Sequence, residues 1–175
     1  VVARSRDKLE DLKKEVETKH GTKVRGLPKD LSDPKAPQEI FSELGKEGVN
    51  VDVLVNNAGV PVYGKFAETN LPEELDMIQV NITSLTHLTK LFMQKMVEDK
   101  SGWILNVGSA AGFVREPLWA VYGASKAFVL SFTEALANEL QGTGVSVTCL
   151  CPGVTDIRFY ERGSIWNAKY AKPPA

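Results

Sequence analysis

Strand and helix signals alternate along the whole chain, and this rhythm limits the possible folds more than any other feature. Apolar runs such as Val51–Val55 and Trp103–Val107 each end at a small-residue turn, and a segment with helical periodicity follows. Strands linked by helices pair in parallel through right-handed crossovers, with helices on the faces of the sheet. The pattern therefore predicts a single α/β domain over residues 1–175, with a doubly wound parallel sheet in three layers.

Caps and turn residues set the expected elements. Ser5 or Asp7 can cap a helix that ends at Gly21, and the β-branched run Val51–Val55 is typical of a strand buried on both faces. A long helical stretch, 71–98, contains Asn81, whose amide competes with backbone hydrogen bonds and predicts a local break. The remaining predictions are strands at 1–4, 23–27, 103–107 and 145–150, helices near 40–48 and from about 122 onward, and a loop-rich tail at 158–175.

Composition excludes several classes of function. The formal net charge is −1, which gives no electrostatic basis for nucleic-acid binding. No apolar run reaches the roughly 20 residues that a membrane-spanning helix needs. The two cysteines, Cys149 and Cys151, have no second Cys/His cluster to complete a metal site. We therefore expect no metal, and interpret both cysteines as buried thiols in a reducing, cytoplasmic compartment.

Tyr122 and Lys126 form the pair with the clearest chemical meaning. They are four residues apart at the start of a strongly helical segment, so they share one helical face with Cβ atoms about 5–6 Å apart. The ammonium favours the phenolate and lowers the tyrosine pKa from about 10. Such a tyrosine can give or take a proton at an alcohol or carbonyl oxygen. Ordinary amphipathic helices also show this spacing, so the pair alone does not establish catalysis.

Unusual residues follow the other predicted strands, where ligands bind in an open parallel sheet. The segment Asn56–Gly59 is small enough for a flat ring or a ribose to approach the backbone, although Asn and Gly also form plain turns. Ser109 could bond a substrate oxygen beside Tyr122, or belong to a turn of small residues. The segment Pro152–Thr155 could contact a ligand carboxamide, or be an ordinary β-to-α loop.

Arg4 and Ser5 follow the first predicted strand. In dinucleotide-binding folds an acidic residue near this place holds the ribose 2′-OH, whereas arginine accommodates a 2′-phosphate. Arg4 therefore favours NADP over NAD, and a solvated charged turn is the alternative. The expected helix break at Asn81 could free a backbone carbonyl to hold a water molecule near Lys126.

Taken together, these motifs resemble the short-chain dehydrogenase/reductase family, in particular its NADP-dependent cytosolic reductases. The matching positions are Asn56–Gly59, Asn81, Ser109, Tyr122 with Lys126, and Pro152 with Gly153, in the order and spacing of the family. The resemblance implies a Rossmann-like fold and an oxidoreductase that transfers hydride between NADP(H) and a small alcohol or carbonyl substrate. It also implies a dimer or a tetramer.

The same resemblance implies a role for each site residue. Tyr122 would be the general acid/base, Lys126 would lower its pKa and bind the nicotinamide ribose, and Ser109 would orient the substrate oxygen. Asn81 would anchor a water molecule in the proton relay. The residues implied to contact NADP are Arg4, Ser5, Asp30, Leu31, Asn56, Asn57, Ala58, Gly59, Tyr122, Lys126, Pro152, Gly153 and Thr155.

Two features of the family are not recognisable: the first strand with its Thr-Gly-x-x-x-Gly-x-Gly loop, and the last strand. The first strand lies in the middle of the family's sheet, so we expect unpaired edges on its two neighbours. The loop normally holds the pyrophosphate, so we expect weak NADP(H) binding by this chain. Our interpretation is an internal fragment of a longer reductase. The alternative function is a catalytically inactive binding or regulatory module.

Overall fold

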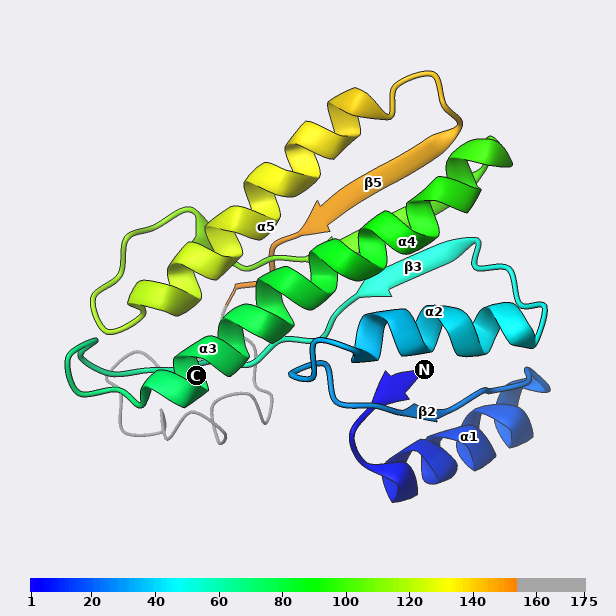
Figure 1. Ribbon diagram of the computed structural model, residues 1–175, viewed down its shortest axis with the longest axis horizontal. Coiled ribbons are helices and arrows are strands. Elements are labelled where there is room, and N and C mark those ends of the chain that lie inside the picture. Colours follow the sequence, from blue (N-terminus) through cyan, green and yellow to red (C-terminus); the bar gives the residue numbers. More distant parts are fainter. Residues whose placement is uncertain (154–175) are drawn as a thin grey trace.

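The computed structural model describes residues 1–153 of the 175. Its elements alternate between strands and helices, and every strand pairing is parallel, as the sequence predicts (Figure 1). In chain order they are β1 (Val2–Ala3), α1 (Arg6–His20), β2 (Leu27–Pro28), α2 (Ala36–Lys46), β3 (Val53–Asn56), α3 (Leu71–Ile78), the π-helix η1 (Gln79–Ser84), α4 (Leu85–Glu98), β4 (Gly102–Val107), the 3-10 turn η2 (Ala110–Gly112), α5 (Ala120–Glu139) and β5 (Val145–Leu150).

The strands of the described residues form two separate sheets. One has the order β1-β2 and the other β3-β4-β5. Within this part of the chain, β1 pairs only with β2 and β3 pairs only with β4, so each has one unpaired edge. This confirms the unpaired edges expected from the sequence. The strand predicted at 23–27 is shorter and later, at Leu27–Pro28, and Pro28 has no N–H to extend a ladder.

Helix α1 begins and ends where its capping residues predict. Ser5 is the N-cap, and its side-chain oxygen accepts a hydrogen bond from the Lys8 backbone N–H. Gly21 ends the helix in the left-handed region at φ 62°, and its N–H bonds the Glu17 carbonyl. The buried Leu9 side chain packs against Gly26, just before β2.

The hydrophobic core lies between the larger sheet and the helices that cover one of its faces (Figure 1). Ile104 of β4 and Val145 of β5 face Phe92 of α4 and Leu136 of α5, and all four side chains are buried. The ring of Phe41 from α2 meets Phe92 edge-on at 5.3 Å between centroids. This core positions α5, the helix with the Tyr/Lys pair, over the carboxyl ends of β4 and β5.

The prediction that Val51–Val55 is buried on both faces is wrong. Val53 and Val55 of β3 are 55% and 51% exposed, and Trp103, the partner of Val53 in β4, is 55% exposed. Alternate residues of a strand point to opposite faces, and α4 and α5 cover only the face that carries Ile104. Among the described elements, none covers the face of Val53. The β-branched composition of this strand therefore predicted more burial than the strand has.

The long helix predicted at 71–98 is continuous but changes geometry in its middle. α3 passes into the π-helix η1 over Gln79–Ser84 and then into α4. Asn81 lies inside η1, which confirms the local break expected there. Through residue 153, the structure contains no helix with the length and apolar character needed to cross a lipid bilayer.

The turn between α5 and β5 supplies a test of this fold. Gly142 and Gly144 both have positive φ, 76° and 83°, a region that costs other residues about 1–2 kcal/mol. A Cβ at Gly144 would lie 2.0 Å from the Lys100 carbonyl oxygen, whereas one at Gly142 would meet nothing within 4 Å. We expect Gly144→Ala to lower the free energy of unfolding by about 3 kcal/mol or more, and the control Gly142→Ala by about 1 kcal/mol. Urea unfolding measures both, and equal losses would contradict this packing.

Candidate active site

Tyr122 and Lys126 lie in the first turns of α5 and are both buried, with 7% and 5% of their surface exposed. The Lys126 ammonium donates a hydrogen bond to the Val107 carbonyl at 2.8 Å and lies 5.9 Å from the centre of the Tyr122 ring. Burial lowers the pKa of Lys126 to about 8, and the nearby Cys149 and Cys151 thiols act in the opposite direction. The helix therefore holds a buried ammonium beside a phenol, as its spacing predicts.

Ser109 sits on a turn that packs directly against α5. It is the N-cap of η2, and its hydroxyl accepts a hydrogen bond from the Ala111 N–H at 3.2 Å. A Cβ on Gly112 would lie only 2.9 Å from the Lys126 carbonyl oxygen, so a larger residue there would push η2 away from α5. The predicted serine and the Tyr/Lys helix are thus held together by close backbone contact.

Asn81 connects this helix to the loop after β3. Its side-chain amide donates to the Val60 carbonyl at 3.0 Å and to the Ser125 hydroxyl at 3.1 Å, and its carbonyl oxygen accepts from the Val60 N–H at 3.0 Å. Ser125 in turn donates to the Tyr122 carbonyl at 2.7 Å. Asn81 and Ser125 are 1% and 0% exposed. The amide therefore joins η1, α5 and the 57–62 loop, beside the two catalytic candidates.

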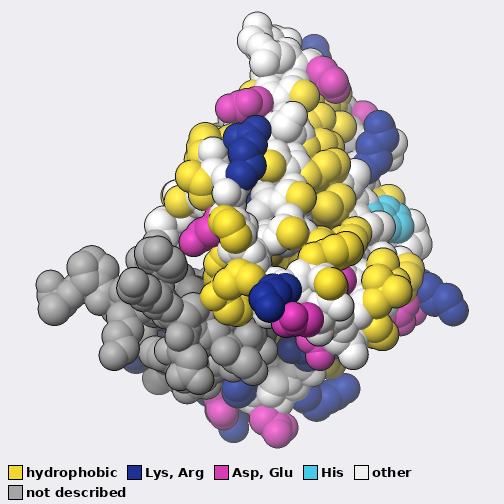
Figure 2. Space-filling model, turned by 90° about the vertical axis from the view of Figure 1, so that its left-hand side faces the viewer, with side chains coloured by type: hydrophobic (Ala, Val, Ile, Leu, Met, Phe, Trp, Pro, Cys, Tyr) yellow, Lys and Arg dark blue, Asp and Glu magenta, His cyan; other side chains and the backbone are white. Residues whose placement is uncertain are grey.

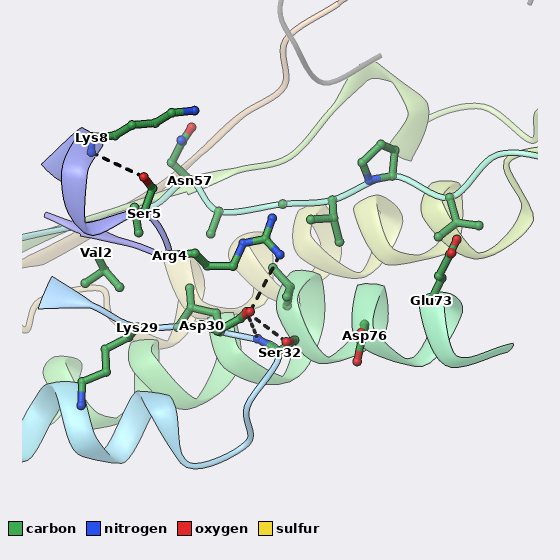
Figure 3. Close-up of a pocket in the computed structure, with 18 residues that line it drawn as sticks. Val2, Arg4, Ser5, Lys8, Lys29, Asp30, Ser32, Asn57, Glu73 and Asp76 are labelled. Atoms are coloured by element: carbon green, nitrogen blue, oxygen red, sulfur yellow. Dashed lines mark hydrogen bonds and ion pairs between the residues drawn. The ribbon is translucent and has the colours of Figure 1, made fainter. Parts of the chain in front are cut away.

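A cavity of about 740 Å³ gathers most of the predicted cofactor residues (Figure 3). Arg4 and Ser5 line it from the end of β1 and the start of α1, and Asp30 and Leu31 line it from the loop after β2. The small segment Asn57–Gly59 forms part of its wall. Figure 3 shows the Arg4 side chain directed toward Asp30, and their charged atoms are 3.8 Å apart.

Asn56 does not join this cavity, contrary to the role that the resemblance implied. Its side-chain amide donates to Thr89 of α4 and to Asn106 of β4, both at 2.9 Å, and it is 7% exposed. Asn56 is the last residue of β3 and points into the helix-covered face, whereas Asn57 points to the cavity. Its role in the described structure is to bind β3 to β4 and α4.

The third predicted strand end is only partly described. The Pro152 carbonyl accepts a hydrogen bond from the Ala110 N–H at 2.9 Å, which places it beside Ser109. Gly153 is exposed and follows directly. Thr155 and the predicted tail at 158–175 lie outside the described residues.

Sequence reasoning missed Ser125 and Lys8. Ser125 precedes Lys126, and only its tertiary contact with Asn81 distinguishes it from any helical serine. Lys8 lines the cavity together with Arg4 and Ser5. Its position in the first turn of α1, three residues after the N-cap Ser5, was the available signal.

This arrangement has clear relatives among known proteins. Residues 1–164 match the family described as short chain dehydrogenase. The chain belongs to this family. Sulfoacetaldehyde reductase 2 of Chromohalobacter salexigens is 37% identical over 161 residues, which is 91% of this chain and 63% of that protein. Ketoacyl reductase HetN of Nostoc is 35% identical over 133 residues, which is 76% of this chain and 46% of that protein.

Solved structures agree with the family and the Rossmann-like fold. A short-chain dehydrogenase from Sphingobium yanoikuyae in complex with NADPH has a TM-score of 0.88 and 32% identity, over 94% of this chain and 64% of that one. A metagenomic short-chain oxidoreductase in complex with NADP has a TM-score of 0.79 and 30% identity, over 90% of this chain and 70% of that one. The chain spans about half to two thirds of the length of the curated relatives named above.

The buried ammonium gives a prediction about stability and pH. Lys126 has a pKa of about 8 in the folded chain and about 10.4 when unfolded. Between these values the unfolded chain binds more protons, so the free energy of unfolding gains up to about 1.4 kcal/mol per pH unit from this group. We expect the stability of the wild type relative to Lys126→Met to rise as the pH increases from 8 to 10.

Urea unfolding at several pH values measures this difference. Burial also raises the pKa of Cys149, to about 11, so the folded chain loses stability through this thiol as the pH rises above the thiol's unfolded pKa. The loss occurs in both proteins. Because the Lys126 ammonium interacts with Cys149, its removal makes the loss larger in the variant, which does not reverse the expected rise. Lys14→Met, on the exposed surface of α1, is the control and should differ from wild type equally at all pH values. A difference between wild type and Lys126→Met that is independent of pH would overturn the prediction.

Proposed function

We propose that this short-chain dehydrogenase is the catalytic part of an NADP(H)-dependent oxidoreductase that acts on an alcohol or carbonyl group. The observation that carries the proposal is the burial of Tyr122 and Lys126 against the Ser109 turn, next to Gly59 in the wall of the cavity around Arg4. The family contributes the reaction class. Because the chain covers only part of its relatives, activity is proposed for the complete protein.

The site residues divide the chemistry between proton transfer and positioning. Tyr122 gives its phenolic proton to the substrate oxygen during reduction and takes it back during oxidation. The Lys126 ammonium, held by the Val107 carbonyl, favours the phenolate, which eases proton donation during reduction and keeps the base form populated for oxidation. Ser109 donates a hydrogen bond to the same substrate oxygen. Proton transfer of this kind typically contributes about 10²–10⁴-fold to the rate. The hydrogen bond from Asn81 to Ser125 holds η1 against α5.

The described residues fit a nicotinamide dinucleotide. The cavity of about 740 Å³ is large enough for a nucleoside with its phosphates. Gly59 in its wall adjoins the catalytic candidates, because a Cβ on Gly59 would lie 3.5 Å from both the Lys126 ammonium and the Asn81 side-chain oxygen. Arg4 and Lys8 supply positive charge for a 2′-phosphate, and Asp30 supplies an acceptor for an adenine amino group. The bound nicotinamide would supply the hydride. Relatives in complex with NADPH and NADP support this choice of cofactor.

The substrate side of the site favours an apolar carbonyl compound. Trp119 lies between Tyr63 and Tyr122, with ring centroids 5.1 and 5.0 Å apart, and forms an aromatic wall beside the phenol. Phe66 and Phe113, in the loops that precede α3 and α5, are 65% and 57% exposed. Their exposure argues against a role in packing. Figure 2 views the end of the molecule where α3 and α5 begin, and shows hydrophobic side chains at its surface.

A second candidate is an inactive binding or regulatory module. The observation that favours it is the unpaired edge on both β1 and β3 within residues 1–153, because unpaired edges can accept a strand from another chain. The two candidates differ in turnover and in the use of the Arg4 cavity, which the following experiments measure.

The choice of cofactor can be tested on the chain as it stands. Adenosine 2′-phosphate carries the group that Arg4 is proposed to bind, and it lacks the pyrophosphate. We expect it to bind about tenfold more tightly than adenosine, since a charge-assisted hydrogen bond contributes about 1.5–3 kcal/mol. Arg4→Ala should remove that advantage. Arg6→Ala is the matched control, because Arg6 is the first residue of α1 and does not line the cavity. This variant should retain the tighter binding of adenosine 2′-phosphate. Calorimetric titration gives the six affinities, and equal binding of adenosine and adenosine 2′-phosphate by the wild type contradicts the proposal.

The acid/base role can be tested in the complete protein that contains this chain. Tyr122→Phe removes only the hydroxyl, so we expect kcat to fall at least about 100-fold while the Kd for NADPH changes less than about threefold. Single-turnover hydride transfer and fluorescence titration of NADPH measure the two quantities. Retention of more than a tenth of the wild-type kcat would exclude Tyr122 as the proton donor.

A further inference from the structure

Cys149 and Cys151 bring two thiols together beside the site. Their sulfur atoms are 3.5 Å apart, and both side chains are half-buried. Residues two apart in an extended chain point to the same face, which explains their contact. A Cβ on Gly108 would lie 2.8 Å and 3.0 Å from the two sulfurs. Gly108 therefore leaves room for the pair, since any other residue there would displace one thiol.

The surroundings of the pair keep it close to the catalytic candidates. Cys149 pairs with Asn106 across β4 and β5 and is hydrogen-bonded to Thr133 of α5. Lys126 is near enough for both thiols to affect its pKa. Among residues 1–153 there is no group of three or more His, Cys, Asp or Glu side chains that could hold a metal ion. The structure thus offers a site with two sulfur ligands.

The distance between the sulfurs suits a chelate better than a disulfide. A three-coordinate, pyramidal centre with bonds to sulfur of about 2.3 Å and an angle of about 100° between them holds its two sulfurs about 3.5 Å apart. A disulfide needs about 2.0 Å, so the two sulfurs would have to approach each other by about 1.5 Å. That movement would pull on Leu150 and Pro152, whose carbonyls accept hydrogen bonds from Gly108 and Ala110.

The protonation of Cys149 narrows the class of ligand. Burial raises the pKa of Cys149 to about 11, so this thiol is neutral at pH 7 and a poor nucleophile toward peroxides. A trivalent arsenical of the type R–As=O reacts with two thiols. Two As–S bonds form, the As=O bond and two S–H bonds break, and both protons leave with the oxygen as one water molecule. No electrons are transferred, so neither an oxidant nor a reductant is needed.

We propose that Cys149 and Cys151 form a dithiol site that binds trivalent arsenicals as a two-sulfur chelate. The site lies at the carboxyl end of β5, and the bonds Gly108 N–H to Leu150 O at 2.8 Å and Ala110 N–H to Pro152 O at 2.9 Å connect it to the turn that carries Ser109. The proposal does not depend on the proposed oxidoreductase activity.

The test uses phenylarsine oxide and the purified chain. Native mass spectrometry should show one adduct per chain, which an added dithiol removes and glutathione does not. Cys149→Ser and Cys151→Ser should each lose this stable adduct. A thermal melt followed by circular dichroism should show a higher Tm for the wild type in the presence of phenylarsine oxide, because a ligand that binds the folded chain stabilises it. The two serine variants should show no such increase.

Each other outcome decides against the site. An equally stable adduct in either single-cysteine variant would show independent thiols. A lower Tm for the wild type would show that the unfolded chain binds the arsenical better than the folded one. If a serine variant does not fold, thiol titration of the folded wild type tests the proposal instead. Two thiols should react with a disulfide reagent before the arsenical is added, and none should react afterwards. Continued reaction of either thiol would overturn the proposal.

Discussion

A buried chain of hydrogen bonds across β3, β4 and α5 is the interaction on which the rest of the structure depends. The Asn56 amide donates to Asn106, and the Asn106 amide donates to the Thr133 hydroxyl at 3.0 Å, with all three side chains at most 7% exposed. Asn56 and Asn106 are register partners. A shift of one residue would leave buried amides unpaired, at about 1–3 kcal/mol each, so this chain of bonds fixes where the strands end.

The strand ends in turn bring the reactive groups together. Because β3, β4 and β5 are in fixed register, Gly59, the Ser109 turn and Pro152 follow at one edge of the sheet. Lys126 reaches this edge from α5 and bonds the Val107 carbonyl. A buried ammonium with a lowered pKa costs stability. In the proposed function this cation acts on the neighbouring phenol, so the cost is a compromise between stability and activity.

The cavity around Arg4 connects the two sheets. Its walls come from the β1–α1 junction, from the loop after β2 and from the segment 57–62 after β3. The Arg4–Asp30 pair, 3.8 Å apart and partly exposed, is held only weakly. In the proposed function, Arg4 therefore exchanges the Asp30 carboxylate for a phosphate at small cost. The apolar face of β3 and β4 at Val53 and Trp103, by contrast, is open in the described residues.

The sequence by itself determined the features that depend on near neighbours: the β/α order, the caps Ser5 and Gly21, the break at Asn81 and the spacing of Tyr122 and Lys126. Most of the residues predicted to contact a cofactor line one cavity, and their role stays a prediction. Only the tertiary structure decided that Asn56 turns inward, that Ser125 bonds Asn81, that Val53 is exposed and that two thiols touch. Caps and periodicity are local, whereas burial and side-chain partners depend on which distant elements pack together.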